Sequence, residues 1–172
     1  MLKTKIAVFV SGGGTNFEAL INAQENGKIP HGEIVLMVSS SKTAYALKRA
    51  ENHGIKSVVC SKKELGSQER FEEEILKNLE ENDIQLIVLA GFMSILSNEF
   101  TKKYENRIIN IHPSLIPSFC GEGFYGLHVH EAALKKGVKV TGATVHIVNE
   151  IPDGGPIIMQ IGRASCRERV FR

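Results

Sequence analysis

Seven short apolar runs, separated by stretches of helical periodicity, most constrain what this chain can fold into. Several runs are apolar at consecutive positions, which is typical of strands covered on both faces. The runs occupy residues 6–10, 34–38, 57–60, 86–90, 108–111, 143–148 and 157–161. This pattern predicts an α/β protein with a Rossmann-like, doubly wound, mainly parallel sheet.

Helical periodicity appears in three of the intervening stretches. Apolar side chains lie on one helical face in residues 17–21 and again in residues 71–79. A third helix is expected from about 43 to 53, because Gly54 suits the position that follows a helix. The 172 residues contain no internal repeat, low-complexity segment or linker, so one domain is expected.

Composition and cysteine usage favour a cytoplasmic protein. Hydrophobic residues make up 42% and charged residues 23% of the chain, and no apolar run is long enough to span a membrane. The start, MLKTKIAVFVSGGG, lacks the cleavage site of a signal peptide. Cys60, Cys120 and Cys166 have neither CxxC nor CxxH spacing, which favours a reducing compartment over a disulfide framework or a zinc site.

The net charge gives no sign of a nucleic-acid or membrane partner. The formal charge of the chain is +2, but residues 162–172 contribute +3 through four arginines and one glutamate, which leaves −1 for the rest. The body of the protein is therefore not basic, and we expect neither a nucleic-acid surface nor a polybasic membrane motif.

The segment SGGGTN, residues 11–16, follows the first apolar run and precedes a helix. Glycines and a helix N-terminus suit phosphate binding, because backbone N–H groups can turn toward the anion. The dinucleotide fingerprint fails, since Phe17 replaces its third glycine and residues 39–42 lack the acid that holds a ribose. A mononucleotide or sugar phosphate is favoured; NADP, or a turn without a ligand, remains open.

Asn110 and His112 end the fifth run and flank Ile111, so both side chains point to the same face of a strand. An amide beside an imidazole suits acyl-type chemistry, with an oxyanion donor and a proton carrier side by side. Pro113 and Pro117 stiffen the loop that follows. Asp153, before two glycines, could orient the imidazole, but spacing alone does not show contact, and a structural role remains open for each residue.

The remaining polar motifs carry weaker expectations. His128 and His130 begin a probable helix without a third metal ligand at suitable spacing, and His146 is expected to face the cleft or the core. Glu72, Glu73 and Glu74 are interpreted as the solvated face of a helix. Ser114 lacks a nucleophile elbow and Cys120 lacks a base, so no covalent nucleophile is expected.

Five motifs in this order, SGGGTN, LAGFMSIL, NIHPSLIPSF, GATVH and DGGPII, resemble the phosphoribosylglycinamide formyltransferase family over about residues 5–160. HPSL with a later D-x-G also occurs in methionyl-tRNA formyltransferase and formyltetrahydrofolate deformylase. The opening SGGGTN favours the glycinamide enzyme, because in that family this loop holds the ribonucleotide phosphate.

The resemblance implies the formyltransferase fold and transfer of a formyl group from 10-formyltetrahydrofolate, as co-substrate, to glycinamide ribonucleotide. It also implies no metal, and a monomer or homodimer. Gln68 and Ser94 stand where some members have arginine, so contacts to the folate tail are expected to differ. The implied catalytic residues are Asn110, His112 and Asp153, the phosphate-binding residues Gly14, Thr15 and Asn16, and the folate-binding residues Gln68, Met93, Ser94, Ile95, Leu96, Asn110, Asn149, Glu150, Ile151, Pro152 and Asp153.

The end of the chain bears no likeness to this family. Residues 162–172, GRASCRERVFR, replace the strand and helix with which the family continues. We therefore expect a formyltransferase domain over residues 1–161 that lacks its C-terminal part. Residues 162–172 are expected to be a non-native tail that packs poorly.

Overall fold

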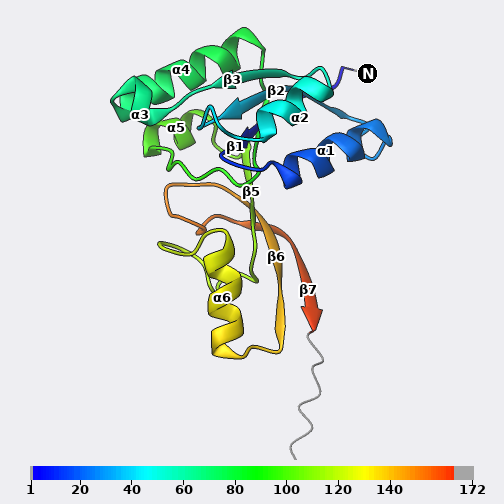
Figure 1. The fold of residues 1–172 in the computed structure, drawn as a ribbon, viewed down its shortest axis with the longest axis vertical. Coiled ribbons are helices and arrows are strands. Elements are labelled where there is room, and N and C mark those ends of the chain that lie inside the picture. The colour runs from blue at the N-terminus through cyan, green and yellow to red at the C-terminus, as the bar shows by residue number, and fades with distance from the viewer. Residues whose placement is uncertain (1, 165–172) are drawn as a thin grey trace, which may run out of the picture.

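A computed structural model of the chain describes residues 2–164, which form a seven-stranded sheet flanked by helices (Figure 1). The strands are β1 (Thr4–Val10), β2 (Gly32–Ser39), β3 (Lys56–Val59), β4 (Leu86–Leu89), β5 (Ile108–His112), β6 (Val140–Ile147) and β7 (Ile157–Ala164). The helices are α1 (Thr15–Glu25), α2 (Ala46–Asn52), α3 (Lys62–Leu65), α4 (Gln68–Glu81), α5 (Asn98–Lys103) and α6 (Leu127–Lys136).

The order of the strands confirms the predicted doubly wound sheet. The strands lie in the order β3-β2-β1-β4-β5-β6-β7, and neighbours from β3 to β5 are parallel. The last two pairings, of β5 with β6 and β6 with β7, are antiparallel. β1 and β4 are neighbours, so the chain reverses its direction of winding between them, where α/β proteins bind ligands.

Two apolar cores cover the two faces of the parallel part of the sheet. Side chains that alternate along β1 separate onto opposite faces, which explains why its apolar residues are consecutive. Phe71 of α4 and Phe100 of α5 are packed into one core together with Phe9. Phe17 of α1 and Ala46 of α2 are packed into the other with Val8. Three layers result, with the sheet in the middle.

Local signals explain where individual helices begin and end. Ser67 and Ser97 cap α4 and α5, each side chain accepting a hydrogen bond of 3.2 Å from a backbone N–H in the first turn. The helix expected at residues 43–53 is shorter than predicted, running from Ala46 to Asn52. Gly54 follows it with φ of 64°, as its sequence position suggested.

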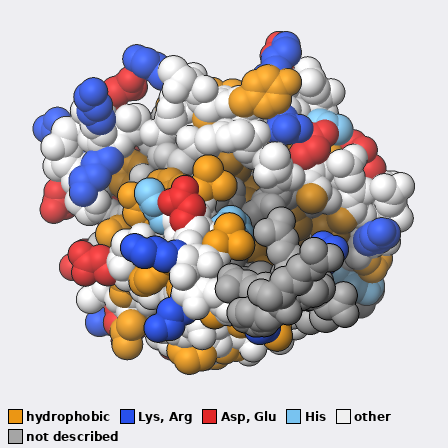
Figure 2. Space-filling model, turned by 60° about the horizontal axis from the view of Figure 1, so that its bottom comes forward, with side chains coloured by type: hydrophobic (Ala, Val, Ile, Leu, Met, Phe, Trp, Pro, Cys, Tyr) orange, Lys and Arg blue, Asp and Glu red, His pale blue; other side chains and the backbone are white. Residues whose placement is uncertain are grey.

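β5 connects the three-layered part to a lower part made of β6, β7 and α6 (Figure 1). This lower part carries many exposed apolar side chains, among them Ile158, Met159 and Ile161 of β7, at 52%, 56% and 66% exposure. Hydrophobic side chains accordingly gather over much of this end of the molecule, between charged ones (Figure 2). β7 continues through Ala164 alongside β6, past the expected boundary at residue 161, whereas residues 165–172 of the expected tail lie outside the described residues.

None of the helices within residues 2–164 has the combination of length and apolar character needed to cross a membrane.

Candidate active site

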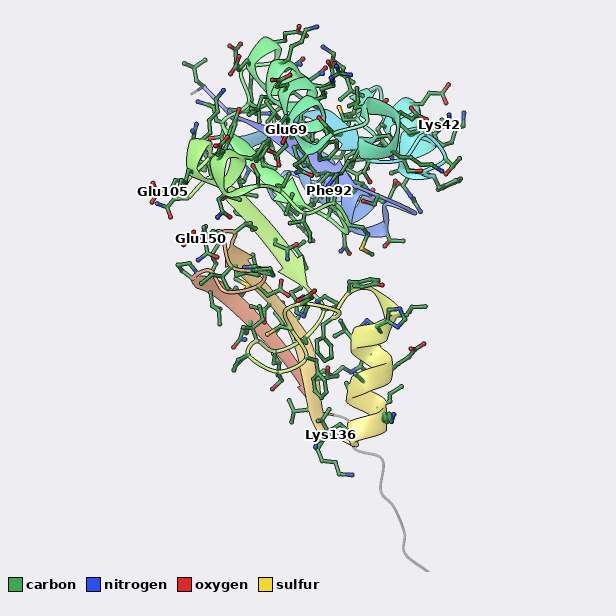
Figure 3. All side chains as sticks on the ribbon, turned by 90° about the vertical axis from the view of Figure 1, so that its left-hand side faces the viewer. Lys42, Glu69, Phe92, Glu105, Lys136 and Glu150 are labelled. Carbon is green, nitrogen blue, oxygen red and sulfur yellow. The ribbon has the colours of Figure 1, made fainter. Side chains whose placement is uncertain are left out.

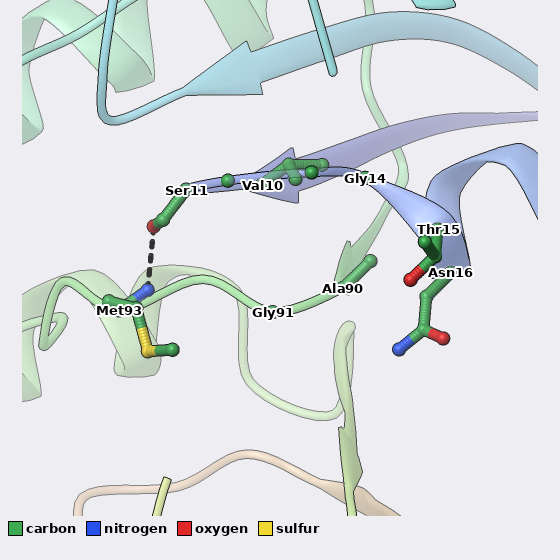
Figure 4. A pocket seen from close by; sticks show the side chains of 10 residues that line it. Val10, Ser11, Gly14, Thr15, Asn16, Ala90, Gly91 and Met93 are labelled. Atoms are coloured by element: carbon green, nitrogen blue, oxygen red, sulfur yellow. Dashed lines mark hydrogen bonds between the residues drawn. The ribbon is translucent and has the colours of Figure 1, made fainter. Parts of the chain in front are cut away.

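The glycine-rich segment lines a pocket of about 340 Å³ at the carboxyl ends of β1 and β4. Its walls are Val10 to Asn16 on one side and Ala90, Gly91 and Met93 on the other (Figure 4). Thr15 and Asn16 begin α1, so their backbone N–H groups belong to the first, unpaired turn of that helix. The pocket therefore offers hydrogen-bond donors and the positive end of a helix dipole, as phosphate binding requires.

Gly14 is needed at its position for two reasons. Its φ is 71°, in the left-handed region, and a Cβ there would lie 2.8 Å from Cβ of Ala46. α2 thus packs directly on the glycine-rich loop. Arg49 of the same helix donates from Nε to the carbonyl oxygen of Gly13 at 2.9 Å and pairs with Glu18 of α1 at 3.0 Å. These contacts tie the glycine-rich loop to α1 and α2.

Ser11 joins the ends of three strands. Its hydroxyl accepts a hydrogen bond from Oγ of Ser40 at 2.6 Å and one from the backbone N–H of Met93 at 2.7 Å (Figure 4). Its own N–H donates to the carbonyl oxygen of Gly91 at 3.0 Å. Ser11 was recognised in the sequence only as part of the SGGGTN motif, and its role in fixing the segment after β4 appears only in three dimensions.

Asn110, His112 and Asp153 come together at the carboxyl end of β5. Nδ1 of His112 lies 3.4 Å from Oδ2 of Asp153, and Nδ2 of Asn110 lies 3.5 Å from Oδ1 of the same carboxylate. His112 is only 4% exposed, and its Nε2 is 2.8 Å from the carbonyl oxygen of Phe119. Because both ring nitrogens face oxygen acceptors, only the doubly protonated ring can donate to both.

His146 is a fourth member of this cluster, and the sequence placed it only in the cleft or the core. It is 1% exposed, and its Nε2 lies 3.1 Å from Nδ2 of Asn110 and 3.5 Å from Oδ1 of Asp153. Nδ1 of His146 is 2.9 Å from the carbonyl oxygen of Ile147, to which it donates. With Nδ1 donating, a neutral ring accepts at Nε2 from the Asn110 amide, whereas a protonated ring donates from Nε2 to Asp153. His146 stands opposite Asn110 in the pairing of β5 with β6. That pairing would have identified it as a site residue, but the pairing cannot be read from the sequence without the topology of the sheet.

Asp153 is held as a carboxylate by its surroundings. Burial raises its pKa, but hydrogen bonds from His146 and from the N–H of Gly121, at 2.9 Å, together with the charges of His112 and His146, bring the pKa below its ordinary value. Its backbone has φ of 54°, a left-handed conformation that turns the chain back toward β7. The group is therefore ionised and positioned at neutral pH.

The loop after β5 is fixed by more than its prolines. Thr144 of β6 accepts a hydrogen bond from the N–H of Ile116 at 3.1 Å and donates to the carbonyl oxygen of Ser114 at 2.7 Å. Gln160 of β7 donates to the carbonyl oxygen of Ile116 at 2.9 Å. Both antiparallel strands therefore brace the loop that begins at His112, including the cis peptide bond between Ile116 and Pro117.

Apart from Asn110 on β5, the expected folate-binding residues form two segments and one bridging side chain. The first segment, residues 93–96, exposes Met93 and Ile95 by 55% and 78%. It adjoins the loop between β5 and α6, because a Cβ at Gly126 would lie 3.6 Å from Cε of Met93. The second, residues 149–153, connects β6 to β7; Figure 3 shows Glu150 there and Phe92 beside the first segment. Gln68 reaches the first segment through a 3.0 Å hydrogen bond from Nε2 to the carbonyl oxygen of Ile95.

One prediction about α4 is wrong. The sequence predicts that Glu72, Glu73 and Glu74 form a solvated helix face, but Glu72 is only 8% exposed. Its carboxylate accepts hydrogen bonds from the backbone N–H and the hydroxyl of Ser97. Helical periodicity failed here because a charged residue at the border of the apolar face found donors on the neighbouring loop.

The end of β2 offers few free groups for NADP. Ser39 and Ser40 use their hydroxyls for hydrogen bonds within the protein, and Lys42 pairs with Glu64, so the groups that NADP would need are engaged. Within residues 2–164, no three His, Cys, Asp or Glu side chains are grouped as metal ligands.

A doubly wound sheet with a glycine-rich pocket and an amide–imidazole–carboxylate cluster at neighbouring strand ends fits a class of group-transferring enzymes. Residues 4–163 match the family described as formyl transferase. The chain therefore belongs to the formyl transferase family.

Relatives within this family have more specific names. A phosphoribosylglycinamide formyltransferase of Haemophilus influenzae is 39% identical over 156 residues, covering 91% of this chain and 71% of the relative. The trifunctional purine biosynthetic protein adenosine-3 of Gallus gallus is 48% identical over 158 residues, which cover 92% of this chain and 15% of that protein. The chain thus spans less than a sixth of the trifunctional protein's length.

Solved structures agree with the fold. A glycinamide ribonucleotide transformylase from Geobacillus kaustophilus superposes with a TM-score of 0.88 at 37% identity, covering 96% of this chain and 85% of that one. A phosphoribosylglycinamide formyltransferase from Bacillus halodurans gives 0.87 at 39% identity, covering 96% and 82%. The Rossmann-like formyltransferase fold expected from the sequence is confirmed.

Proposed function

We propose that this chain transfers the formyl group of 10-formyltetrahydrofolate to the amine of glycinamide ribonucleotide, a step in purine synthesis. The observation that carries the proposal is the meeting of Asn110, His112 and Asp153 at one end of β5. β1, β4 and β5 are consecutive parallel strands, so this cluster shares a sheet edge with the phosphate pocket. The names of the relatives support the same reaction.

The substrate ribonucleotide would be bound through its phosphate by the glycine-rich loop. Gly14, Thr15 and Asn16 supply the backbone donors and the side chains at the start of α1. The formyl donor would lie against Met93, Ser94, Ile95 and Leu96 and the connection from Asn149 to Asp153. The exposed apolar side chains of Met93 and Ile95 suit a flat, partly apolar ring system.

The reaction would begin with attack of the amine nitrogen on the formyl carbon. A C–N bond forms, the carbonyl electron pair moves to oxygen, and the C–N10 bond of the donor then breaks while a proton passes from the amine to N10. Asn110 would donate one amide hydrogen to the oxyanion in exchange for its 3.5 Å contact with Oδ1 of Asp153, while the other hydrogen faces His146. His112 would donate from Nε2, exchanging its hydrogen bond to the carbonyl oxygen of Phe119 for one to the oxyanion.

Asp153 would keep His112 oriented and in its protonated form during this sequence. Its carboxylate faces Nδ1 of His112 at 3.4 Å and is fixed from the other side by Gly121. It would also accept the amine proton, through water, before that proton reaches the leaving nitrogen. We expect the protein to act in the cytoplasm, as a monomer or homodimer.

Turnover of 10-formyltetrahydrofolate, measured with and without glycinamide ribonucleotide, tests the proposal. Tetrahydrofolate production that depends on the ribonucleotide supports it. Production without any acceptor would indicate a deformylase, and formylation of methionyl-tRNA in place of the ribonucleotide would indicate the other related transferase. Binding of both ligands without turnover would leave a binding module and contradict the proposal.

A further inference from the structure

Glu72 of α4 is a buried carboxylate that receives three hydrogen bonds. Nε2 of Gln68 and the backbone N–H of Ser97 donate to Oε1 at 2.5 and 2.6 Å, and the hydroxyl of Ser97 donates to Oε2 at 2.5 Å. No ion pair involves Glu72 anywhere in residues 2–164. A charge buried without a cation is costly unless several donors surround it. Helix packing alone would be served as well by an apolar side chain, so the carboxylate calls for another explanation.

The three hydrogen bonds converge on the segment that follows β4. Ser97 ends this segment and caps α5 by accepting from the N–H of Phe100 at 3.2 Å. Gln68 uses its amide nitrogen a second time, donating to the carbonyl oxygen of Ile95 at 3.0 Å. Glu72 therefore fixes the end of the segment directly and its middle through Gln68.

The start of the segment is fixed independently. The N–H of Met93 donates to Oγ of Ser11 at 2.7 Å. The ring of Phe92 lies 5.1 Å from that of Phe9 and 6.5 Å from that of Phe71, so it anchors the backbone in the core (Figure 3). The side chains of Met93 and Ile95 are therefore exposed on a backbone that is hydrogen-bonded near both ends.

We infer that Glu72 is a positioning residue for the binding site of the formyl donor, an inference that rests on the proposed function. Its carboxylate holds Gln68 and Ser97, which hold residues 93–97 in the shape that receives the donor's ring system. Nε2 of Gln68 and the backbone N–H of Ser97 can only donate, so each needs an acceptor oxygen. The amide of a glutamine keeps one acceptor oxygen, so its N–H₂ group would either face one of these donors or reverse the hydrogen bond with the Ser97 hydroxyl and leave the hydroxyl hydrogen unpaired.

A consequence concerns Gln68 itself. Both hydrogens of its amide are used, one by Glu72 and one by Ile95. Gln68 therefore presents only its oxygen to a ligand and acts mainly as a bridge within the protein. The effect of replacing it should resemble that of replacing Glu72.

The test compares Glu72→Gln with Glu73→Gln, which removes the same charge from an exposed position one residue away on the same helix. Amide hydrogen exchange is measured over residues 93–97, and dissociation constants are measured separately for 10-formyltetrahydrofolate and glycinamide ribonucleotide. In Glu72→Gln we expect exchange of this segment and the donor's dissociation constant each to rise about tenfold, with the ribonucleotide's constant within about twofold. Glu73→Gln should match the parent.

Unchanged exchange and unchanged donor affinity in a folded Glu72→Gln chain would overturn the inference. So would equal losses for both ligands, because a purely structural role would weaken both. If Glu72→Gln does not fold, Gln68→Ala decides, since it removes the bridge and leaves the buried carboxylate in place. A parent chain that binds no donor would count against the proposed function, while the exchange measurement would still decide whether Glu72 holds this segment.

Discussion

Nδ1 of His112 lies 3.4 Å from Oδ2 of Asp153, while Nε2 of the same ring lies 2.8 Å from the carbonyl oxygen of Phe119. A ring with an oxygen at each nitrogen satisfies both only when it carries both protons. One oxygen comes from the loop between β5 and α6 and the other from the connection between β6 and β7, so this environment exists only in the folded protein.

His112→Ala should abolish formyl transfer while the formyl donor still binds. Removing the imidazole removes a proton carrier and an oxyanion donor, effects of about 10² to 10⁴ each. Single-turnover rates and the dissociation constant of 10-formyltetrahydrofolate measure this. His128→Ala, at an exposed position on α6, is the control. Activity of His112→Ala within a few-fold of the parent would contradict the assignment.

Asp153→Asn should remove most activity with the fold intact, because a neutral amide no longer offers Nδ1 of His112 a charged acceptor. Asparagine tolerates the left-handed backbone at this position, so the loop should keep its shape. We expect a loss of about 10² or more in kcat. Asp83→Asn is a matched control, since Asp83 also has a positive φ but lies on the surface. Retained activity in Asp153→Asn would exclude the carboxylate from catalysis.

Gly14→Ala should weaken binding of the ribonucleotide and lower stability. The added Cβ would be 2.8 Å from Cβ of Ala46, so α2 and the phosphate loop must separate. Gly27→Ala is the control for backbone strain alone, because Gly27 has a similar φ of 70° but no atom within 4 Å of the added Cβ. We expect Gly14→Ala to be destabilised by about 1–3 kcal/mol more than Gly27→Ala. Equal melting temperatures and unchanged affinity for the ribonucleotide would contradict this.

His53 should make stability depend on pH near neutrality. Its hydrogen bonds with Glu25 and Glu18, at 2.9 and 3.1 Å, raise its pKa above the ordinary value of 6.5. A raised pKa means that the stabilisation is complete below pH 6.5 and is lost as the pH rises through the higher folded value. Melting temperatures of the parent and His53→Gln should therefore differ at about pH 6 and converge at about pH 9. His31→Gln, at an exposed position, serves as control; a difference independent of pH would contradict the prediction.

The expectation for the end of the chain remains a prediction. Ile157, Met159 and Ile161 of β7 are 47%, 56% and 66% exposed, more apolar surface than an outer strand normally leaves in water. Replacing residues 162–172 with the C-terminal segment of the Haemophilus influenzae relative should raise both the melting temperature and the rate of formyl transfer. Equal melting and equal activity of the two forms would show that the chain does not depend on that segment.

The fold could be predicted because its signals are local. Consecutive apolar residues identify strands buried on both faces, and the periodicity around Phe71 identifies α4. The glycine-rich loop and the alternation of Asn110 and His112 around Ile111 also depend only on neighbouring residues. These features were enough to predict the class of fold, the glycine-rich turn before α1 and the shared face on which the amide and imidazole lie.

Only the tertiary structure decided which distant groups meet these residues. His146 reaches Asn110 because β6 runs antiparallel to β5 in one particular register, and Glu72 is buried because Ser97 lies across from α4. Neither contact can be recognised from the local sequence pattern, because His146 is one histidine within a strand and Glu72 is one of several glutamates in a helix. Apolar periodicity records which face of an element is buried, whereas a polar contact depends on two elements whose relative position the whole sheet determines.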